Sequence, residues 1–316
     1  MKVPWIFILR RTVFLFPVLL GVSFIAFVIL NILPGDPALM LVGERASKVT
    51  LENMRKKMGL DKSLIQQYGI YLKKLLVLDL GNSLVSREPV LGALLKRLPA
   101  TVLLASASIV VASLLGIFCG TLCAIYRGGY IDMFLTSLTL LGISMPVFWV
   151  GLMLILIFAV TWQIFPPSTE EVGLEYLILP VLTLSMRSAS YIARITRTSV
   201  LDVLSLDHVR TARAKGLTPM TVTLKHVLFN AFIPIITVVG LDFASYLNGS
   251  VITETIFNWP GVGRYTMNAI LQRDYPVVQG MVILGAFVFV SMNLLVDLSY
   301  GILDPKIRDD YLQGRF

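Results

Sequence analysis

The side chains with the most evident capacity for chemistry form a basic stretch, residues 209–234, that interrupts a very apolar chain; we call it the basic loop. Its basic side chains are Arg210, Arg213, Lys215, Lys225 and His226. The pattern predicts two short helices, of which the first begins at Asp207 as N-cap and ends at Gly216 in the left-handed conformation. Thr218 is the expected N-cap of the second, because Pro219 suits a first helical position. Two short, capped, basic helices indicate a docking surface for another macromolecule.

Three ionisable residues fall within apolar stretches long enough to cross a membrane, namely Arg187, Asp242 and Asp297. A charge at the bilayer centre costs about 2.5–3.5 kcal/mol on insertion scales, so each must face a cavity, a bundle interior or a partner. The two aspartates could line a pathway for a charged substrate. Alternatively, Arg187 pairs with one of them, or reaches the interface, and serves assembly only; we favour this structural interpretation. The residues are few and do not repeat between the two halves of the chain, which argues against a proton-coupled carrier.

Sequence motifs for enzymatic chemistry are absent. The chain contains no G-x-x-x-x-G-K-[ST] phosphate loop, no H-E-x-x-H and no G-x-S-x-G. Its two histidines, His208 and His226, lack companion ligands for a metal. Cys119 and Cys123 lie four apart in an apolar run, where packing is the expected role. We therefore expect neither an enzymatic activity nor a cofactor in this chain.

The elements that must position these residues are membrane-spanning helices. The chain is 56% hydrophobic and 15% charged with a mean hydropathy of +0.80, whereas soluble domains carry about 25% charged residues. Six apolar runs are long enough to span, at 12–33, 100–126, 133–164, 176–198, 232–256 and 278–303. The first is too long for a signal-peptide core, so we expect a retained span.

Glycine and tryptophan positions, and the segment 34–99, add expectations about helix packing and about position relative to the membrane. Gly116 and Gly120 form a small-xxx-small pattern that permits close approach of another helix. Trp149, Trp162 and Trp259 lie near span ends and are expected to anchor the chain at the membrane interface. Residues 34–99 are expected to form a small helical cap, with one helix from Thr50 to Gly59 and a second that begins at Ser63.

The distribution of Lys and Arg indicates the orientation. With a cytoplasmic N-terminus, both chain ends and the basic loop lie inside, and the two short outer loops hold only Arg264 and Arg273. The net charge of +8 then reflects inner loops, so no nucleic-acid partner is expected. A DNA-binding helix-turn-helix at the basic loop is a competing interpretation, but the flanking spans leave little room for a duplex.

Several motifs follow one another along nearly the whole chain. The basic loop reads Arg210-Thr211-Ala212-Arg213-Ala214-Lys215-Gly216-Leu217, then His226 and Asn230-Ala231-x-x-Pro234. The others begin at Leu33 (LPGDP), Thr253 (TETIFNWPGVGR), Arg273 (RDYPVVQ), Asn293 (NLLVD) and Asp304 (DPKIR). Together they resemble the permease subunits of ABC importers, in the branch that imports dipeptides, oligopeptides, glutathione and nickel complexes. The chain departs from the general importer motif at Arg210, where that motif has Glu although the peptide branch often does not, and from the branch itself at Phe229, where Arg is common.

The resemblance implies an all-α integral membrane protein of the bacterial plasma (inner) membrane, with six transmembrane helices and the type I ABC importer permease fold. Residues 1–33 would form the cytoplasmic N-terminus and first span, and 34–99 a helical extracytoplasmic loop. Residues 100–303 would form a five-helix core with a cytoplasmic coupling loop at 199–231, followed by a cytoplasmic tail, 304–316. The implied partners are a second permease subunit, two ATPase subunits that bind ATP and Mg, and an extracytoplasmic substrate-binding protein.

The resemblance also assigns residues and cargo. Contact with the ATPase subunits is expected from Val209, Arg210, Thr211, Ala212, Arg213, Ala214, Lys215, Gly216, Leu217 and Met220. Val209, Leu217 and Met220 are expected to anchor the loop in an ATPase groove, with the basic residues adding polar contacts. We expect a peptide cargo, with glutathione, nickel chelates or another small solute as alternatives. An independent channel or secondary carrier is the less favoured hypothesis.

Overall fold

The computed structural model describes residues 5–32, 38, 47–167 and 172–303. Within them the regular structure is helical, apart from one isolated antiparallel bridge between Asn82 and Pro89. The helices are α1 (Trp5–Ile32), α3 (Lys48–Met58), α4 (Leu64–Leu76), α5 (Val90–Ile125), α6 (Tyr130–Ser144), α7 (Val147–Leu154), η1 (Ile155–Thr161), α8 (Leu174–Leu204), α9 (Asp207–Ala214), α10 (Pro219–Thr221), η2 (Val222–Leu228), α11 (Phe229–Leu247), α12 (Val251–Ile256), α13 (Val262–Leu271) and α14 (Tyr275–Leu303). The expected all-α class is confirmed, and η1 and η2 are π-helical.

Four helices in the described part are long and apolar enough to cross a membrane, namely α5, α8, α14 and the run α10–η2–α11. The pair α6 and α7–η1 would make a fifth, but it is bent by 102°. The predicted span 133–164 is therefore not one continuous helix but is broken near its middle. Pro146 is the N-cap of α7 and forces Met145 out of the helical conformation, which explains the break. In α1 the described apolar segment, Phe16–Val28, is shorter than a full span.

The predicted fifth span, 232–256, also has the wrong limits. The helix begins much earlier, at Pro219, and ends at Leu247, where Asn248 forms the C-cap. Gly249 follows with φ +90°, a backbone conformation that glycine adopts without strain. The rest of the predicted span forms the separate short helix α12. The turn at Gly249 thus moves the TETIFNWPGVGR motif out of the span and onto the end of the bundle.

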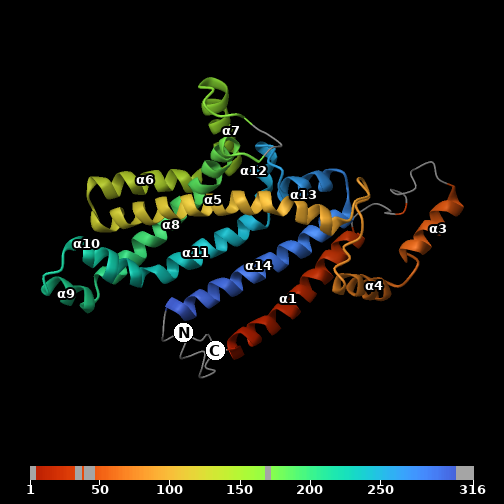
Figure 1. Ribbon diagram of the computed structural model, residues 1–316, viewed down its shortest axis with the longest axis horizontal. Helices are drawn as coiled ribbons and strands as arrows, with labels where there is room; N and C mark the ends of the chain where they lie inside the picture. The colour runs from red at the N-terminus through yellow and green to blue at the C-terminus, as the bar shows by residue number, and fades with distance from the viewer. Residues whose placement is uncertain (1–4, 33–37, 39–46, 168–171, 304–316) are drawn as a thin grey trace.

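The helices α5 and α8 form the centre of the bundle, with α6 and α11 packed against them (Figure 1). A methyl group on Gly116 would lie 2.7 Å from Ile192 Cβ and 2.8 Å from the Ala189 carbonyl oxygen. One on Gly120 would meet the carbonyl of Ala193. These two glycines therefore let the backbones of α5 and α8 approach closely, as the small-xxx-small pattern predicts. On the other side of the bundle, α14 packs between α11 and α1.

The two ends of the bundle differ in what they carry. Figure 1 shows α9 and α10 at one end and α13, α4 and α3 at the opposite end.

The N-cap of α3 is Ser47, whose hydroxyl accepts from the Thr50 amide, so the expected cap at Thr50 is off by three residues. Gly59 ends α3 with φ +71°, and Ser63 precedes α4, as expected. The sequence pattern thus located α3 and α4.

Candidate functional site

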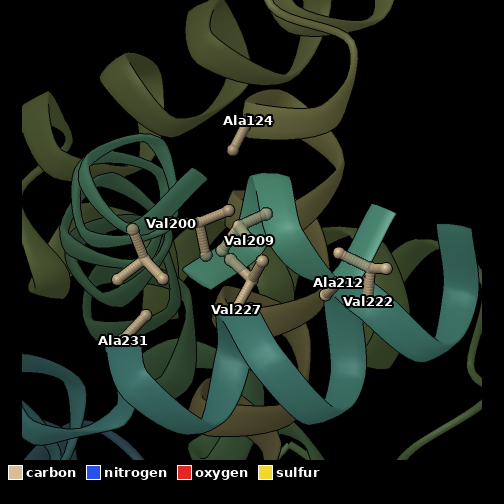
Figure 2. Packing of buried hydrophobic residues seen from close by; sticks show 8 residues of the cluster. Ala124, Val200, Val209, Ala212, Val222, Val227 and Ala231 are labelled. Atoms are coloured by element: carbon tan, nitrogen blue, oxygen red, sulfur yellow. The ribbon is translucent and has the colours of Figure 1, made fainter. Parts of the chain in front are cut away.

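The basic loop is built onto a small apolar core of its own, shown in Figure 2. Its members are Ala124 of α5, Val200 and Val203 of α8, Val209 and Ala212 of α9, Val222 and Val227 of η2, and Ala231 of α11. Val209 and Val227 are fully buried. The ends of three long helices and the loop therefore share one packed cluster, so the loop is held rigidly against the bundle.

The turn between α9 and α10 is fixed by backbone hydrogen bonds. Gly216 has φ +78°, and its amide donates to the Arg213 carbonyl at 2.9 Å. The Thr218 hydroxyl accepts from the Thr221 amide at 3.3 Å, with Pro219 in the first turn, so both predicted caps are confirmed. The expected N-cap at Asp207 is wrong, because Leu206 is the N-cap and Asp207 is the first helical residue. Its carboxylate is well placed there against the helix dipole.

The outward face of the loop combines positive charge with apolar side chains. The exposed residues of the predicted coupling set are Arg210, Thr211, Arg213, Ala214, Lys215, Gly216, Leu217 and Met220. Met220 is 67% exposed and Leu217 is 39% exposed, so both can contact a partner. Val209 and Ala212 are buried in the chain's own core, so the expectation that Val209 inserts into a partner's groove is wrong. The i, i+3 spacing of these two apolar residues on a polar helix was the signal of the inward face.

The three predicted intramembrane charges do not form an ion-pair cluster. Arg187 on α8 is exposed at the chain's own surface, and Asp242 on α11 is half-buried with Ser188 and Arg187 as its polar neighbours. No ion pair joins Arg187 to Asp242 or to Asp297 in the part of the chain that the structure describes. Asp297 lies half-buried on α14. The hypothesis of an Arg187 ion pair with either aspartate is therefore not supported.

Sequence reasoning missed a buried ion pair between α6 and α8. Asp132, in the first turn of α6, receives two hydrogen bonds of 2.8 Å from Nε and Nη2 of Arg197 on α8. Its carboxylate also accepts from the Gly128 amide at 2.9 Å and from the Thr136 hydroxyl at 3.2 Å. The pair joins α6 to α8 about one turn before Val200, a member of the apolar cluster beneath the basic loop.

The TETIFNWPGVGR motif folds around a buried carboxylate at the other end. Glu254 is fully buried, and its oxygens accept from the Thr101 hydroxyl at 2.9 Å and the Arg264 amide at 3.0 Å. Burial raises the pKa of the Glu254 carboxyl, and these hydrogen bonds act in the opposite direction. A methyl group on Gly261 would collide with the Glu254 carboxylate, which explains why glycine follows Pro260.

The same network fixes the tryptophan of the motif. Trp259 is fully buried, and its indole N–H donates to the Ala100 carbonyl of α5 at 2.9 Å. Thr101 also accepts from the Val262 amide at 2.9 Å. The expectation that Trp259 anchors the membrane interface is therefore wrong, because it locks α12 and α13 onto α5. Trp149 and Trp162 are both exposed, as interfacial side chains must be.

Comparison with known proteins gives consistent matches. A family model described as binding-protein-dependent transport system inner membrane component matches residues 112–309, and its N-terminal companion matches residues 5–105. The chain is 39% identical to the dipeptide transport system permease protein DppB of Escherichia coli K12, over 96% of this chain and 98% of that protein. It is equally similar, at the same coverages, to the di/tripeptide transport system permease protein DppB of Pseudomonas aeruginosa.

Solved structures support the fold independently. A chain of the inward-facing MetNI methionine ABC transporter superposes with a TM-score of 0.59, at 17% sequence identity. The match covers 69% of this chain and 99% of that chain, and a second crystal form of the same transporter gives a TM-score of 0.57. At this identity the likeness concerns the fold alone.

Proposed function

The chain belongs to the family of binding-protein-dependent transport system inner membrane components, and from this membership we propose that it forms half of an import pathway for peptides. It is a membrane-embedded permease subunit of an ABC importer, and ATP hydrolysis takes place in separate subunits. The peptide cargo rests on one observation: full-length relatives named for dipeptide or di/tripeptide transport share 39% identity across 96% of the chain. Glutathione, nickel chelates and other small solutes are the alternatives.

We also propose the arrangement of the complex. A second, homologous permease subunit completes the pathway, two ATPase subunits bind ATP and Mg on the cytoplasmic side, and a binding protein delivers cargo outside. Both chain ends and the basic loop face the cytoplasm, because Lys and Arg gather on that side of the predicted spans. The basic loop is then the surface that receives an ATPase subunit.

The packing of the basic loop supports this coupling role. A force on the exposed face of α9 would pass through Val209 to Val200 of α8 and Ala124 of α5, since these side chains belong to one cluster. Because packed cores deform little, the ends of α5, α8 and α11 would move together with the loop. ATP-driven closure of the ATPase subunits would thus rock the bundle as a body. For Arg187, Asp242 and Asp297 we propose roles in assembly rather than in the pathway.

A pair of substitutions at Gly216 tests the coupling role. Gly216→Pro removes the amide that donates to Arg213 and cannot adopt φ +78°, whereas Gly216→Asn can retain the left-handed conformation. In the reconstituted complex, we expect Gly216→Pro to lose ATP-dependent uptake or ATPase binding, and Gly216→Asn to retain both. If the proline variant assembles and transports as the wild type does, the loop does not couple ATP hydrolysis to transport.

Charge reversal tests the docking face separately. Arg213→Glu changes an exposed residue of the loop, and Arg127→Glu changes an exposed residue of the α5–α6 turn as the matched control. We expect Arg213→Glu to weaken ATPase association, more strongly at low ionic strength, and Arg127→Glu to leave it unchanged. Equal effects of the two variants would indicate a general charge effect rather than a docking site.

The cargo is tested by uptake. Proteoliposomes with the full complex and its binding protein should accumulate a labelled dipeptide in an ATP-dependent manner, in preference to glutathione and a nickel chelate. Preference for either of the latter would replace the peptide proposal while leaving the permease assignment intact. Flux through liposomes that contain this chain alone would instead favour an independent channel or carrier.

A further inference from the structure

Helix α4 is attached to the side of α1. The Tyr68 hydroxyl lies 3.0 Å from the Ser23 hydroxyl and donates to the Leu20 carbonyl at 3.3 Å. The Tyr68 ring meets Phe24 edge-on at a centroid distance of 5.4 Å, and Phe27 lies at the same distance. These aromatic and hydrogen-bonding contacts hold α4 at one level of α1.

That level is below the outer end of the predicted first span. At a rise of 1.5 Å per residue, Phe24 and Phe27 lie about 10 Å along the helix from Ile32, at the end of α1. The apolar run 12–33 is only about as long as the ~30 Å hydrocarbon core is thick, so its outer end coincides with the membrane boundary. A helix fixed beside Phe24 and Phe27 must therefore lie at the depth of the outer headgroups and upper acyl chains, which is where interfacial helices reside.

One face of α4 is apolar and largely exposed. Ile65, Leu72 and Leu76 follow the i, i+7, i+11 spacing of a single helix face; Ile65 is 86% and Leu76 is 74% exposed, and Leu72 is half-buried. Exposed Val77 and Leu78 extend this surface past the end of the helix. The exposed polar residues Gln66 and Lys73 occupy a different face, so α4 is amphipathic.

We propose that α4 is an interfacial membrane helix whose apolar face, formed by Ile65, Leu72, Leu76, Val77 and Leu78, lies in the acyl chains of the outer leaflet. The occupant is lipid because the predicted first span, 12–33, places the contact sites of α4 on α1 at lipid depth. The inference therefore rests on the orientation given under the proposed function. Lys73 and Lys74 in the last turn extend toward headgroups and water, as lysines near a membrane interface do. The helix thereby fixes the height of the outer segment on the membrane.

Spin labels placed on the two faces test this proposal. The full chain, with Cys119 and Cys123 replaced by Ala, is assembled into its complex without the binding protein, in vesicles of phosphatidylethanolamine and phosphatidylglycerol. Single cysteines are introduced by Ile65→Cys and Leu76→Cys on the apolar face and by Gln66→Cys and Lys73→Cys as matched controls. Nitroxide relaxation by oxygen, which concentrates in lipid, is compared with relaxation by a water-soluble nickel complex.

Labels at 65 and 76 are expected to respond mainly to oxygen, and labels at 66 and 73 mainly to the nickel complex. Equal access of the nickel complex to both faces would overturn the proposal, because α4 would then lie in water. Protection of 65 and 76 from both reagents would also overturn it, because a protein surface would then cover the face. Retained ATPase activity of each labelled complex shows that the labelled chain is folded and assembled.

Discussion

Arg197 and Asp132 form a bidentate ion pair, with the guanidinium nitrogens Nε and Nη2 each 2.8 Å from a carboxylate oxygen. The Asp132 side chain is 8% exposed and that of Arg197 is 31% exposed, so the pair is shielded on one side and reaches water on the other. It joins the first turn of α6 to the C-terminal part of α8, about one turn before Val200 of the cluster beneath the basic loop. The position of α6 on the bundle therefore depends on this contact.

Asp132→Asn is expected to destabilise the chain, because the variant leaves the Arg197 guanidinium without a charged partner. Removing one member of a buried pair typically costs about 3–5 kcal/mol, and the partial exposure of Arg197 places this case at the lower end. The thermal unfolding midpoint of the purified complex in detergent should fall accordingly. The double variant Asp132→Asn with Arg197→Gln should recover part of the loss, and failure to recover would mean that the carboxylate acts mainly as a cap for Gly128.

Thr101→Val is expected to destabilise the hydrogen-bond network around Glu254, because Thr101 donates to the Glu254 carboxylate and accepts from the Val262 amide. Leaving these buried groups without partners should cost about 1–3 kcal/mol. Thr101→Ser keeps the hydroxyl and serves as the matched control. Thermal unfolding and limited proteolysis near α12 should separate the two variants, and indistinguishable behaviour would show that the network contributes no stability.

Gly120→Val is expected to separate α5 from α8, because even a methyl group at this position would meet the Ala193 carbonyl, with Thr196 Cβ at 2.7 Å. Overpacking of this kind costs about 1–3 kcal/mol or more. Gly92→Ala is the control on the same helix, since nothing lies within 4 Å of its added methyl. It should be neutral or slightly stabilising, and a similar loss in both variants would locate the effect outside the helix contact.

Substitutions at Val209 and Met220 should affect different properties, the stability of the fold and the affinity for the ATPase subunits. Val209→Ala removes two buried methyl groups from the loop's core and should lower stability by about 2 kcal/mol. Met220→Ala changes a side chain that is 67% exposed, so the stability of the chain should be unchanged, whereas its affinity for the ATPase subunit should fall. Unfolding curves and pull-down of the ATPase subunits measure the two effects, and the reverse pattern would contradict the assignment of faces.

The helices were predictable because each apolar run is long, but their ends were set by contacts that no local pattern contains. Helix α5 begins at Val90, well before the predicted limit at 100, because Val90 and Leu94 pack against Val262 and Val277 of distant elements. The break at Met145 could have been predicted from Pro146 alone. The turn at Gly249 could also have been predicted, since Asn248-Gly249-Ser250 is a turn-forming sequence that interrupts the apolar run 232–256.

The site residues also divide into those that a local signal predicts and those that long-range contacts determine. The caps at Gly216 and Thr218 were predictable, because a left-handed glycine and a Thr-Pro helix start are local signals. The Asp132–Arg197 pair joins residues 65 apart, and the Thr101–Glu254 bond joins residues 153 apart. Nothing in the neighbourhood of these residues in the sequence indicates a partner. Charge within an apolar run indicated Arg187 and the two aspartates, whereas Glu254, a fully buried carboxylate, lies in the short helix α12 within the TETIFNWPGVGR motif.

The two faces of α9 have a consequence for how such a transporter can diverge. Val209 and Ala212 hold the fold from one side of an eight-residue helix, while Arg210, Arg213 and Ala214 occupy the other side. Mutations on the outer side can accumulate without loss of the folded chain, because they disturb no packed contact. If this side receives an ATPase subunit, as proposed above, a duplicated copy of the gene could acquire a different ATPase partner by a few surface changes. Two related importers in one cell would then not share ATPase subunits.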